Sequence, residues 1–378
     1  MDSCTEETLA ALELSLCKGV SNGLIFALLE RFGSARAAMA APVDELLRVD
    51  GIGEETGRAV RRGPDREAVE KELDLMERHR TRLVPFFSED YPRPLKYLDQ
   101  GAPALLRVKG EYLREDGLAV AVVGSRRCSH YGRAQAGRLA SDLASMGLTI
   151  VSGMAQGIDS AAHRGALLAK GRTLAVLGCG LAYPLSPEEL ELAAEIASSG
   201  AVLSELPMET PPRAGNFPPR NRIISGLSLG VVVVEAATRS GSLITAGHAG
   251  EQGKVVFAVP GTVDSPASRG CHALIRDGAV LVESARDVVE GLGPLSAPLD
   301  LPDPAGQDGE VRTVEDARVL ALNERERGVL DLVAGAPCQI EEVIARTGLP
   351  ASVVSSTLLT LEIRGLVRQL PGQRYARG

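Results

Sequence analysis

The sequence lacks several features that define common classes of protein. It contains no tryptophan, only 3% aromatic residues, and six cysteines that stand far apart with no CxxC pair. That cysteine usage argues against a disulfide framework and against a zinc site. No apolar run approaches the ~20 residues that a membrane-spanning helix needs, and the acidic start MDSCTEETLA lacks the pattern of a secretory signal. We therefore expect a cytoplasmic protein with no metal site and no membrane partner.

Positive charge is also in short supply. The chain has 41 basic and 49 acidic residues, a formal net charge of -8, which is the wrong sign for a protein coated by nucleic acid. Only six of the basic residues are lysine, so 35 are arginine, whose planar guanidinium suits bidentate contacts with phosphate. A GC-rich genome produces the same bias. An arginine is therefore taken as a site residue only where its position supports it.

The middle of the chain has the pattern of an α/β protein. From Leu118 on, short apolar runs alternate with helical stretches, which is typical of a parallel sheet with crossover helices. The runs are nearly continuous apolar segments, as expected for strands covered on both faces. They are AVAVVG, LTIVSG, TLAVLG, AVLSEL, GVVVVEA, KVVFAVP and AVLVES. We predict an extended Rossmann-like, doubly wound, mainly parallel sheet over residues 118–291.

Other segments flank this predicted sheet. Residues 1–80 indicate a helical domain, in which PVDELLRVDGIGEETGRAV resembles a helix-hairpin-helix or SAM-like unit. Its Glu54 and Glu55 would repel an anion, which favours a structural role. Residues 81–117 are interpreted as a connector that packs on the core, and 292–321 as a linker rich in Pro, Gly and Asp. Residues 322–378 predict a winged helix, for which partner binding and duplex reading both stay open.

The turn after the first apolar run, AVVGSRRCSHYGRA, has the properties of an anion site. Gly124 ends a strand and a helix begins near Tyr131, so free backbone amides and the positive end of the helix dipole face the turn. A dinucleotide site needs GxGxxG here, whereas this turn has Ser125, Arg126 and Arg127. The bulky arginines disfavour a dinucleotide cofactor and favour a bound phosphate. We accordingly expect no cofactor.

Each later strand also ends in a polar or glycine-rich turn. In a doubly wound sheet the carboxyl ends of the parallel strands share one edge, so these turns should meet at one cleft. The sequence therefore predicts one extended anion-binding surface there. Its candidate residues are Arg126, Arg127, Arg220, Asn221, Arg222, Arg239 and Ser240.

Catalytic constellations are weak in this sequence. Asp159 and His163 lie four residues apart, but Asp159 follows a glycine at a helix start, where capping is the favoured role. Glu205 and Glu235 each end a strand, where they would serve a nucleotide hydrolase or orient loops. No Walker P-loop, HExxH motif or Ser/His/Asp set is present, so no catalytic residue is predicted.

Two alternatives to a nucleic-acid-binding protein stay open. One is a Rossmann-like nucleoside monophosphate phosphoribohydrolase, although ATRSGSLITAGHAGE lacks the PGGxGTxxE loop of such enzymes. The other is a scaffold that binds nucleotides as signals. Titrating single strands against mononucleotides separates these functions.

Six motifs in chain order resemble one family. They are GSRxxSxYG, VSGxAxGID, VLGxG, FPxRNRIISGLS, VVVVEAxxxSGSLITA and VPG, and together they closely resemble DNA-processing protein A, the DprA or Smf family. The resemblance implies a protein, not an enzyme, that binds and protects single-stranded DNA. It also implies a homodimer formed through the Rossmann-like domain, and loading of RecA recombinase onto incoming strands during natural transformation.

The resemblance also assigns residue roles. It implies that Arg126 grips phosphate beside Gly124 and Ser125, and that Lys170 and Asn221 extend the pocket. Gln156 stands where the family commonly has arginine. The complete predicted phosphate-binding set is Gly124, Ser125, Arg126, Arg127, Lys170, Arg220, Asn221, Arg222 and Ser240.

Overall fold

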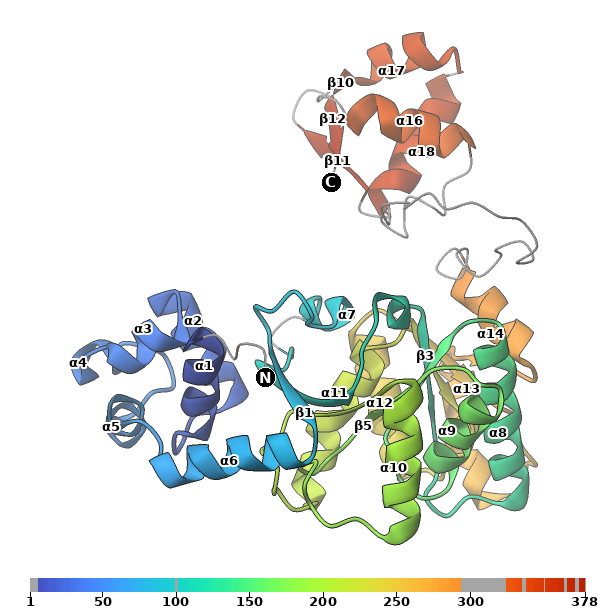
Figure 1. The fold of residues 1–378 in the computed structure, drawn as a ribbon. Helices are drawn as coiled ribbons and strands as arrows, with labels where there is room; N and C mark the ends of the chain where they lie inside the picture. Colours follow the sequence, from blue (N-terminus) through green and yellow to red (C-terminus); the bar gives the residue numbers. More distant parts are fainter. Residues whose placement is uncertain are drawn as a thin grey trace, which may run out of the picture. The chain divides into compact units, whose positions relative to one another are not determined.

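A long, mainly parallel β-sheet forms the centre of the larger of two compact units, Met1–Gly291 and Leu292–Gly378 (Figure 1). The structure, a computed structural model, describes residues 6–98, 101–293, 324–334, 338–349, 351–363, 366–370 and 374–377. Within these ranges the sheet has nine strands in the order β1-β2-β6-β5-β4-β3-β7-β8-β9. The strands are β1 (Thr81–Pro85), β2 (Leu105–Gly110), β3 (Ala119–Val123), β4 (Thr149–Ser152), β5 (Thr173–Val176), β6 (Ala201–Ser204), β7 (Gly230–Val233), β8 (Val255–Ala258) and β9 (Val280–Leu281).

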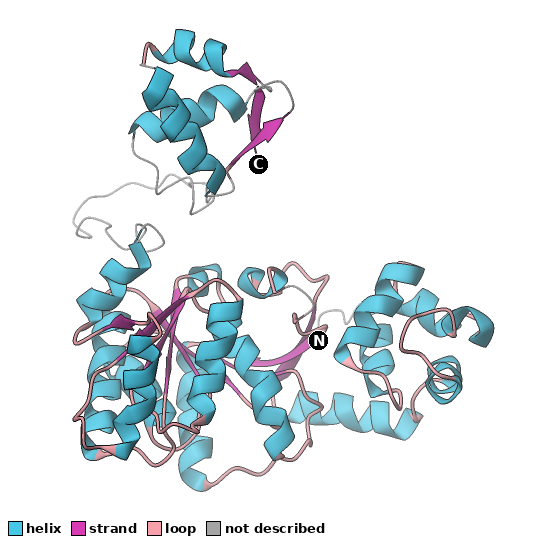
Figure 2. Ribbon diagram, turned by 180° about the vertical axis from the view of Figure 1, so that it is seen from behind, coloured by secondary structure: helices cyan, strands magenta, loops and turns pink. Residues whose placement is uncertain are grey.

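Helices cover both faces of this sheet (Figure 2). The alternation of side chains along β5 shows how the faces differ. Leu174 belongs to the apolar cluster that contains Ile223 of α11, whereas its neighbour Ala175 belongs to the cluster that contains Ile196 of α10. The helices of this unit that follow β1 are α7 (Arg93–Lys96), α8 (His130–Ser145), α9 (Ile158–Leu168), α10 (Pro187–Ser199), α11 (Phe217–Gly226), α12 (Gly241–Glu251), α13 (Arg269–Arg276) and α14 (Ala285–Leu292).

The predicted α/β fold is confirmed, and each of the seven apolar runs contains a strand, β3 to β9. All pairs among these seven strands are parallel. The segment predicted as a connector, 81–117, differs from expectation because it supplies β1 and β2. Strand β2 pairs antiparallel with both β1 and β6 and so extends the sheet at one edge.

The N-terminal segment is helical, as predicted, with α1 (Glu6–Leu16), α2 (Asn22–Phe32), α3 (Ala35–Ala40), α4 (Val43–Leu46), α5 (Glu54–Arg62) and α6 (Arg66–Arg78). In the hairpin between α4 and α5, Val49 and Ile52 are buried, and Gly51 takes a φ of 86° that favours glycine. Glu55, in the first turn of α5, forms an exposed ion pair with Lys18. The hairpin is thus closed by apolar packing.

A buried ion pair joins these helices to the sheet. The Nε of Arg107, on β2, donates to Glu72 of α6 at 2.6 Å, and both side chains are almost wholly buried. The Glu72 carboxylate also accepts the backbone N–H of Met208 at 3.0 Å. Burial lowers the pKa of the Arg107 guanidinium, and the negative charge of Glu72 opposes that shift. The helical segment is therefore anchored to the sheet by charge as well as by apolar contact.

The second unit has the predicted winged-helix architecture. Its elements are α16 (Glu324–Ala334), β10 (Cys338–Gln339), α17 (Ile340–Thr347), α18 (Ala351–Ile363), β11 (Val367–Leu370) and β12 (Arg374–Arg377). The three strands form an antiparallel sheet in the order β10-β12-β11. Val329, Val343 and Leu358, one from each helix, are buried in a common core. The predicted linker lies outside the described residues beyond Gly293.

Candidate functional site

A pocket of about 580 Å³ opens at the carboxyl edge of the parallel strands. It lies where β3 and β7 are neighbours, the point at which the chain order of the strands reverses, and this is the usual binding crevice of doubly wound sheets. Loops after β3, β4, β7 and β8 and the start of α11 form its wall. Its lining includes Gly124, Ser125, Arg126, Arg127, Ala155, Asp159, Phe217, Arg220, Asn221, Ile224, Ser240, Ser242, Thr245 and Pro266.

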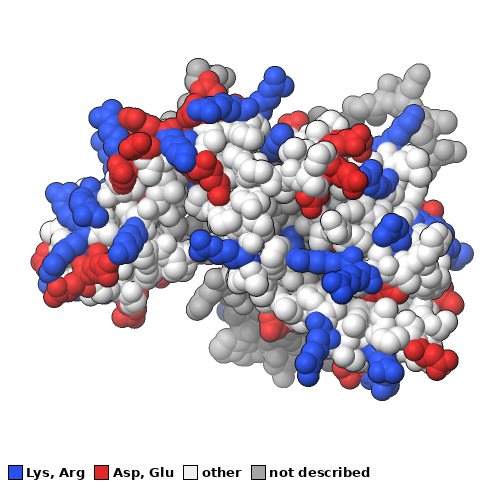
Figure 3. Space-filling model, turned by 90° about the horizontal axis from the view of Figure 1, so that it is seen from below, with Lys and Arg blue, Asp and Glu red and all other residues white. Residues whose placement is uncertain are grey.

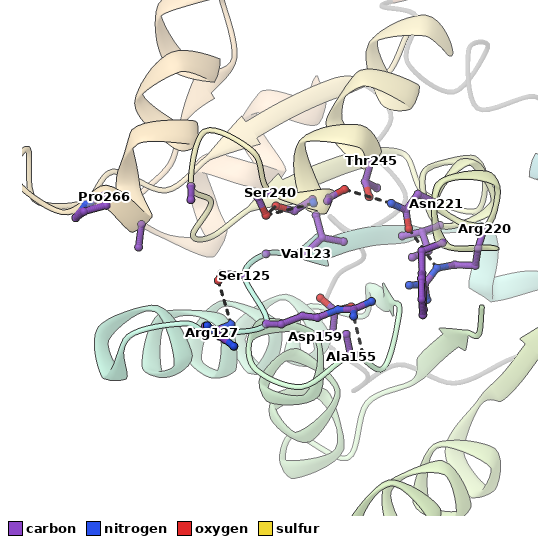
Figure 4. A pocket seen from close by; sticks show the side chains of 18 residues that line it. Val123, Ser125, Arg127, Ala155, Asp159, Arg220, Asn221, Ser240, Thr245 and Pro266 are labelled. Atoms are coloured by element: carbon purple, nitrogen blue, oxygen red, sulfur yellow. Dashed lines mark hydrogen bonds between the residues drawn. The ribbon is translucent and has the colours of Figure 1, made fainter. Parts of the chain in front are cut away.

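The loop after β3 is held in place from the neighbouring strand β7. The N–H of Ser125 donates to the carbonyl of Glu235 at 2.7 Å, and the Glu235 carboxylate accepts the N–H of Ser129 at 2.7 Å. A Cβ on Gly124 would approach the Glu235 carbonyl oxygen to 2.9 Å, so glycine is required for this close approach. Ser129 caps α8, and the Ser125 hydroxyl accepts the N–H of Arg127 at 3.1 Å (Figure 4).

Arg126 lies at the mouth of the pocket, and its side chain packs on an aromatic ring. Arg126 is exposed, and its guanidinium lies 4.6 Å from the centroid of the Phe217 ring on α11. The guanidinium of Arg220 lies 5.8 Å from the same centroid. A cation on a ring face keeps its charge available while its position is restricted. Phe217 was not predicted from the sequence, although it precedes Arg220 by three residues and so shares its helix face.

Arg220 supplies a buried positive charge at the base of the pocket. It donates to the carbonyls of Gly153, at 2.8 Å, and of Val176, and its Nε donates to Asn221 at 3.2 Å. Burial lowers the pKa of Arg220 to about 10, so the group stays protonated at neutral pH. The nearby Asp159 accepts the N–H of Gly153 at 3.2 Å; burial raises the pKa of its carboxyl, which the charge of Arg220 opposes.

The opposite wall comes from the start of α12. Ser240 caps this helix by accepting the N–H of Ser242, and the two hydroxyls lie 2.7 Å apart. The amide nitrogen of Asn221 donates across to the carbonyl of Gly241 at 3.2 Å, which ties α11 to α12. Figure 4 shows Ser240 and Thr245 on this wall, facing Ser125 and Asp159 on the other side.

Two predicted phosphate-binding residues are not in this pocket. Lys170 lies in the turn between α9 and β5, and that turn precedes a strand, so it is at the amino edge of the sheet. Arg222 is on α11, but its guanidinium pairs with both carboxylate oxygens of Glu205, at 2.9 and 2.7 Å. The other seven residues of the predicted set line the pocket. Arg239 is exposed but is not among the lining residues.

The residues that raised the question of catalysis are structural in this arrangement. His163 is buried, and its Nδ1 lies 2.7 Å from the Thr173 hydroxyl. Burial and the charge of Arg220 lower the pKa of His163 to about 3, so the ring is neutral. Glu205 pairs with Arg222. Across the described ranges, no group of three or more His, Cys, Asp or Glu residues is arranged to hold a metal ion.

Two further expectations concern membrane-spanning helices and the distribution of charge on the surface. No helix in the described part of the chain is both long and apolar enough to cross a membrane. The net negative charge of the chain does not prevent local gathering of basic groups. Figure 3 shows a face on which Lys and Arg side chains form a band across the middle, around a hollow.

This fold defines a Rossmann-type α/β protein with an attached winged helix and a pocket at the switch point of its sheet. The parallel sheet with its switch-point pocket, lined by the exposed Arg126 and Arg127, is the feature that sets the class. The chain belongs to the family of DNA recombination-mediator protein A, whose family model matches residues 82–293. The DprA winged helix domain matches residues 315–373. The family predicted from the six motifs is confirmed, and its members are DNA-processing proteins.

Similar proteins of known name come from several bacteria. Protein Smf of Escherichia coli K12 is 41% identical over 310 residues, which cover 81% of this chain and 80% of that protein. The DNA processing protein DprA of Streptococcus pneumoniae R6 is 47% identical over 190 residues, 50% of this chain and 66% of the relative.

Two solved structures resemble the chain as well. The X-ray structure of DprA from Streptococcus pneumoniae has a TM-score of 0.65 at 35% identity and covers 77% of this chain and 98% of that one. A structure of DNA processing protein A from Helicobacter pylori has a TM-score of 0.50 at 29% identity. It covers 56% of this chain and 95% of that one, and it describes a single-stranded DNA binding mode of the Helicobacter pylori protein.

Proposed function

We propose that this protein binds single-stranded DNA through phosphates at the switch-point pocket, and that it protects incoming strands and loads RecA onto them during natural transformation in the cytoplasm. The observation that carries the proposal is the loop from Gly124 to Arg127. Its backbone is fixed by Glu235, while Arg126 and Arg127 stay exposed at the mouth of the pocket. Fixed cations at a helix start are suited to phosphate oxygens.

The state of the buried polar groups supports binding without base reading. The amide nitrogen of Asn221 is bound to Gly241, Arg220 to backbone carbonyls, and Asp159 to backbone amides. These groups are already paired within the protein, so they have little capacity left to read a base edge. A pocket of about 580 Å³ ringed by loops also suits a flexible strand better than a stiff duplex. The single-stranded DNA binding mode described for the Helicobacter pylori relative supports this proposal.

The role of Glu235 counts against the alternative of a nucleotide hydrolase. Its carboxylate accepts the N–H of Ser129 at 2.7 Å, and it belongs to the support of the Gly124 loop. A carboxylate engaged in this way orients the loop and is not free as a base. Competition by mononucleotides against a labelled strand distinguishes the two functions, since a nucleotide enzyme would prefer the mononucleotide.

The proposed functional unit is a homodimer formed through the Rossmann-like unit. Strand β9 is the last strand of the sheet and is exposed at its apolar side chains, with 39% of Val280 and 45% of Leu281 accessible. An exposed apolar edge strand favours pairing with another chain. We therefore propose a dimer contact at β9, with one pocket per protomer.

Replacing Arg126 by alanine tests the strand-binding proposal. We expect affinity for all single-strand sequences to fall by about fivefold at 0.1 M salt, because one phosphate contact contributes ~0.7 to the slope of log K against log salt. That slope should fall by about 0.7. Fluorescence anisotropy over a salt series measures both quantities. The protein's acceleration of RecA nucleation on coated strands should be smaller for the variant as well.

The matched control is Arg114→Ala, which removes an exposed arginine before β3, at the amino edge of the sheet. It should leave affinity and slope unchanged. A folded Arg126→Ala protein with the affinity and slope of the original chain would exclude this pocket as the strand site. Equal affinity for duplex and single strand would also contradict the proposal.

The dimer contact is tested by the double substitution Val280→Lys/Leu281→Lys. The double substitution adds four charges per dimer and removes two apolar contacts per protomer, each worth about 1.5–3 kcal/mol when fully buried. We expect it to weaken self-association by more than about a hundredfold. Sedimentation velocity at micromolar concentration measures this. Leu168→Lys, at a position that is 82% exposed on α9, is the control and should stay dimeric. A dimer that survives the double substitution would place the contact elsewhere.

A further inference from the structure

A second hollow adjoins the switch-point pocket on the side of α8, α9 and α10. Its volume is about 410 Å³, and it is lined by Arg126, Arg133, Gln156, Ser160, Arg164 and Glu188, among others. Arg126 lines both hollows, so the two adjoin at this side chain. We call the second hollow the α8–α9 groove.

The arginines of the α8–α9 groove come from two different helices and one loop. Arg133 lies in the first half of α8 and Arg164 in α9, where it shares a face with Ser160, four residues earlier. Arg126, Arg133 and Arg164 are all exposed. None of the three forms an ion pair with a carboxylate of the described residues. The guanidinium of Arg138, further along α8, is instead occupied by hydrogen bonds that it donates to Gln135 and to the carbonyl of Glu283.

Acidic groups are confined to the far wall of the groove. They are Glu188 and Glu189, at the start of α10. The carboxylate of Glu189 accepts both the N–H and the hydroxyl of Ser186, at 3.0 and 2.8 Å, and so is used in capping the helix. These two carboxylates oppose the three arginines from one wall only. The wall formed by α8 and α9 is therefore the side on which a polyanion would run.

We propose that the α8–α9 groove holds the phosphate backbone of the same single strand as it leaves the switch-point pocket. The inference rests on the proposed function and extends it by giving the strand a direction, past Arg126 toward Arg133 and Arg164. The shared Arg126 favours one strand over a separate acidic protein, because a single phosphate backbone that leaves the switch-point pocket at Arg126 would meet Arg133 and Arg164 next. The site thus has two parts, of which a short oligonucleotide fills only the first.

The double substitution Arg133→Ala/Arg164→Ala tests this path in the full-length chain. Strands of about 4 and about 16 nucleotides, the limits of common single-strand site sizes, serve as probes. With the long strand we expect the salt slope to fall by about 1.4 and affinity to fall by about 25-fold at 0.1 M salt, as for two lost phosphate contacts. The short strand should bind with unchanged affinity and slope. The matched control is Arg93→Ala/Arg114→Ala, which removes two exposed arginines outside both hollows.

The outcomes separate this inference from the proposed function. Unchanged binding of the long strand by Arg133→Ala/Arg164→Ala overturns the path along the groove, even if Arg126→Ala still weakens both strands. An equal loss for short and long strands overturns it too, because the arginines would then act on the first pocket. Normal strand binding with a lost response of RecA would show that the groove docks a protein. If Arg126→Ala leaves both strands unaffected, the proposed function itself fails.

Discussion

Glu72→Ala is expected to lower the free energy of unfolding by about 3–5 kcal/mol, the usual cost of removing one partner from a buried ion pair. The substitution leaves the guanidinium of Arg107 buried without its carboxylate and removes the acceptor of the Met208 N–H. One nitrogen of Arg107, Nη2, already has no hydrogen-bond partner. The remaining charge therefore has little compensation. Denaturant unfolding followed by circular dichroism measures the change.

Two variants show whether the charge is the cause. Glu70→Ala, on the same helix, breaks an exposed ion pair with Arg66 and should change stability little. Combining Glu72→Ala with Arg107→Met should recover much of the loss, because an apolar side chain of similar length replaces the unpaired cation. If Glu72→Ala alone costs less than about 1 kcal/mol, the ion pair is not an anchor between the helices and the sheet.

Gly157→Ala is expected to abolish most strand binding by displacing the loop that carries Arg126. Gly157 has a φ of 90°, a conformation that costs other residues about 1–3 kcal/mol. An added Cβ would lie 2.8 Å from the carbonyl oxygen of Arg126 and 3.0 Å from its carbonyl carbon. These are backbone atoms, so the contact is relieved only by moving the loop. Anisotropy titration should show a loss greater than for Arg126→Ala, together with a lower melting temperature.

Gly247→Ala is the matched control for this prediction. Gly247 lies on α12, is exposed, and has no heavy atom within 4 Å of the position of an added Cβ. Alanine there should be neutral or stabilise the helix by about 0.5–1 kcal/mol. If the Gly157→Ala protein binds single strands as tightly as the Gly247→Ala protein does, the position of the loop does not determine the affinity.

Apolar runs were sufficient to predict the parallel strands, but they did not reveal β1 and β2. The two missed strands read TRLVP and LLRVKG, in which charged side chains interrupt the apolar pattern. Arg107 has the appearance of a surface residue in the sequence. It is nevertheless buried, because its charge is paired with Glu72. Glu72 lies 35 positions away in the sequence and meets Arg107 only in the folded chain. Such a pair leaves no local signal.

The site could be predicted where a residue directly follows a strand. Gly124 to Arg127 follow β3, and the shared carboxyl edge of parallel strands brings them to the pocket. Lys170 was misplaced because it precedes a strand, which puts it at the other edge. Arg222 was misplaced because residues two apart on a helix face different sides, so it cannot join Arg220 at the pocket. Both corrections follow from helix and strand geometry.

The pairing of buried polar groups in the pocket has a consequence for the energetics of the proposed strand site. Because Asn221 and Arg220 are already held by neighbouring groups, the protein loses little conformational freedom on binding. The entropy lost is then mainly that of the strand. Differences between homopolymers should thus reflect the base stacking that each free strand must give up, so a weakly stacked pyrimidine strand enters the pocket at a lower cost than a stacked adenine strand.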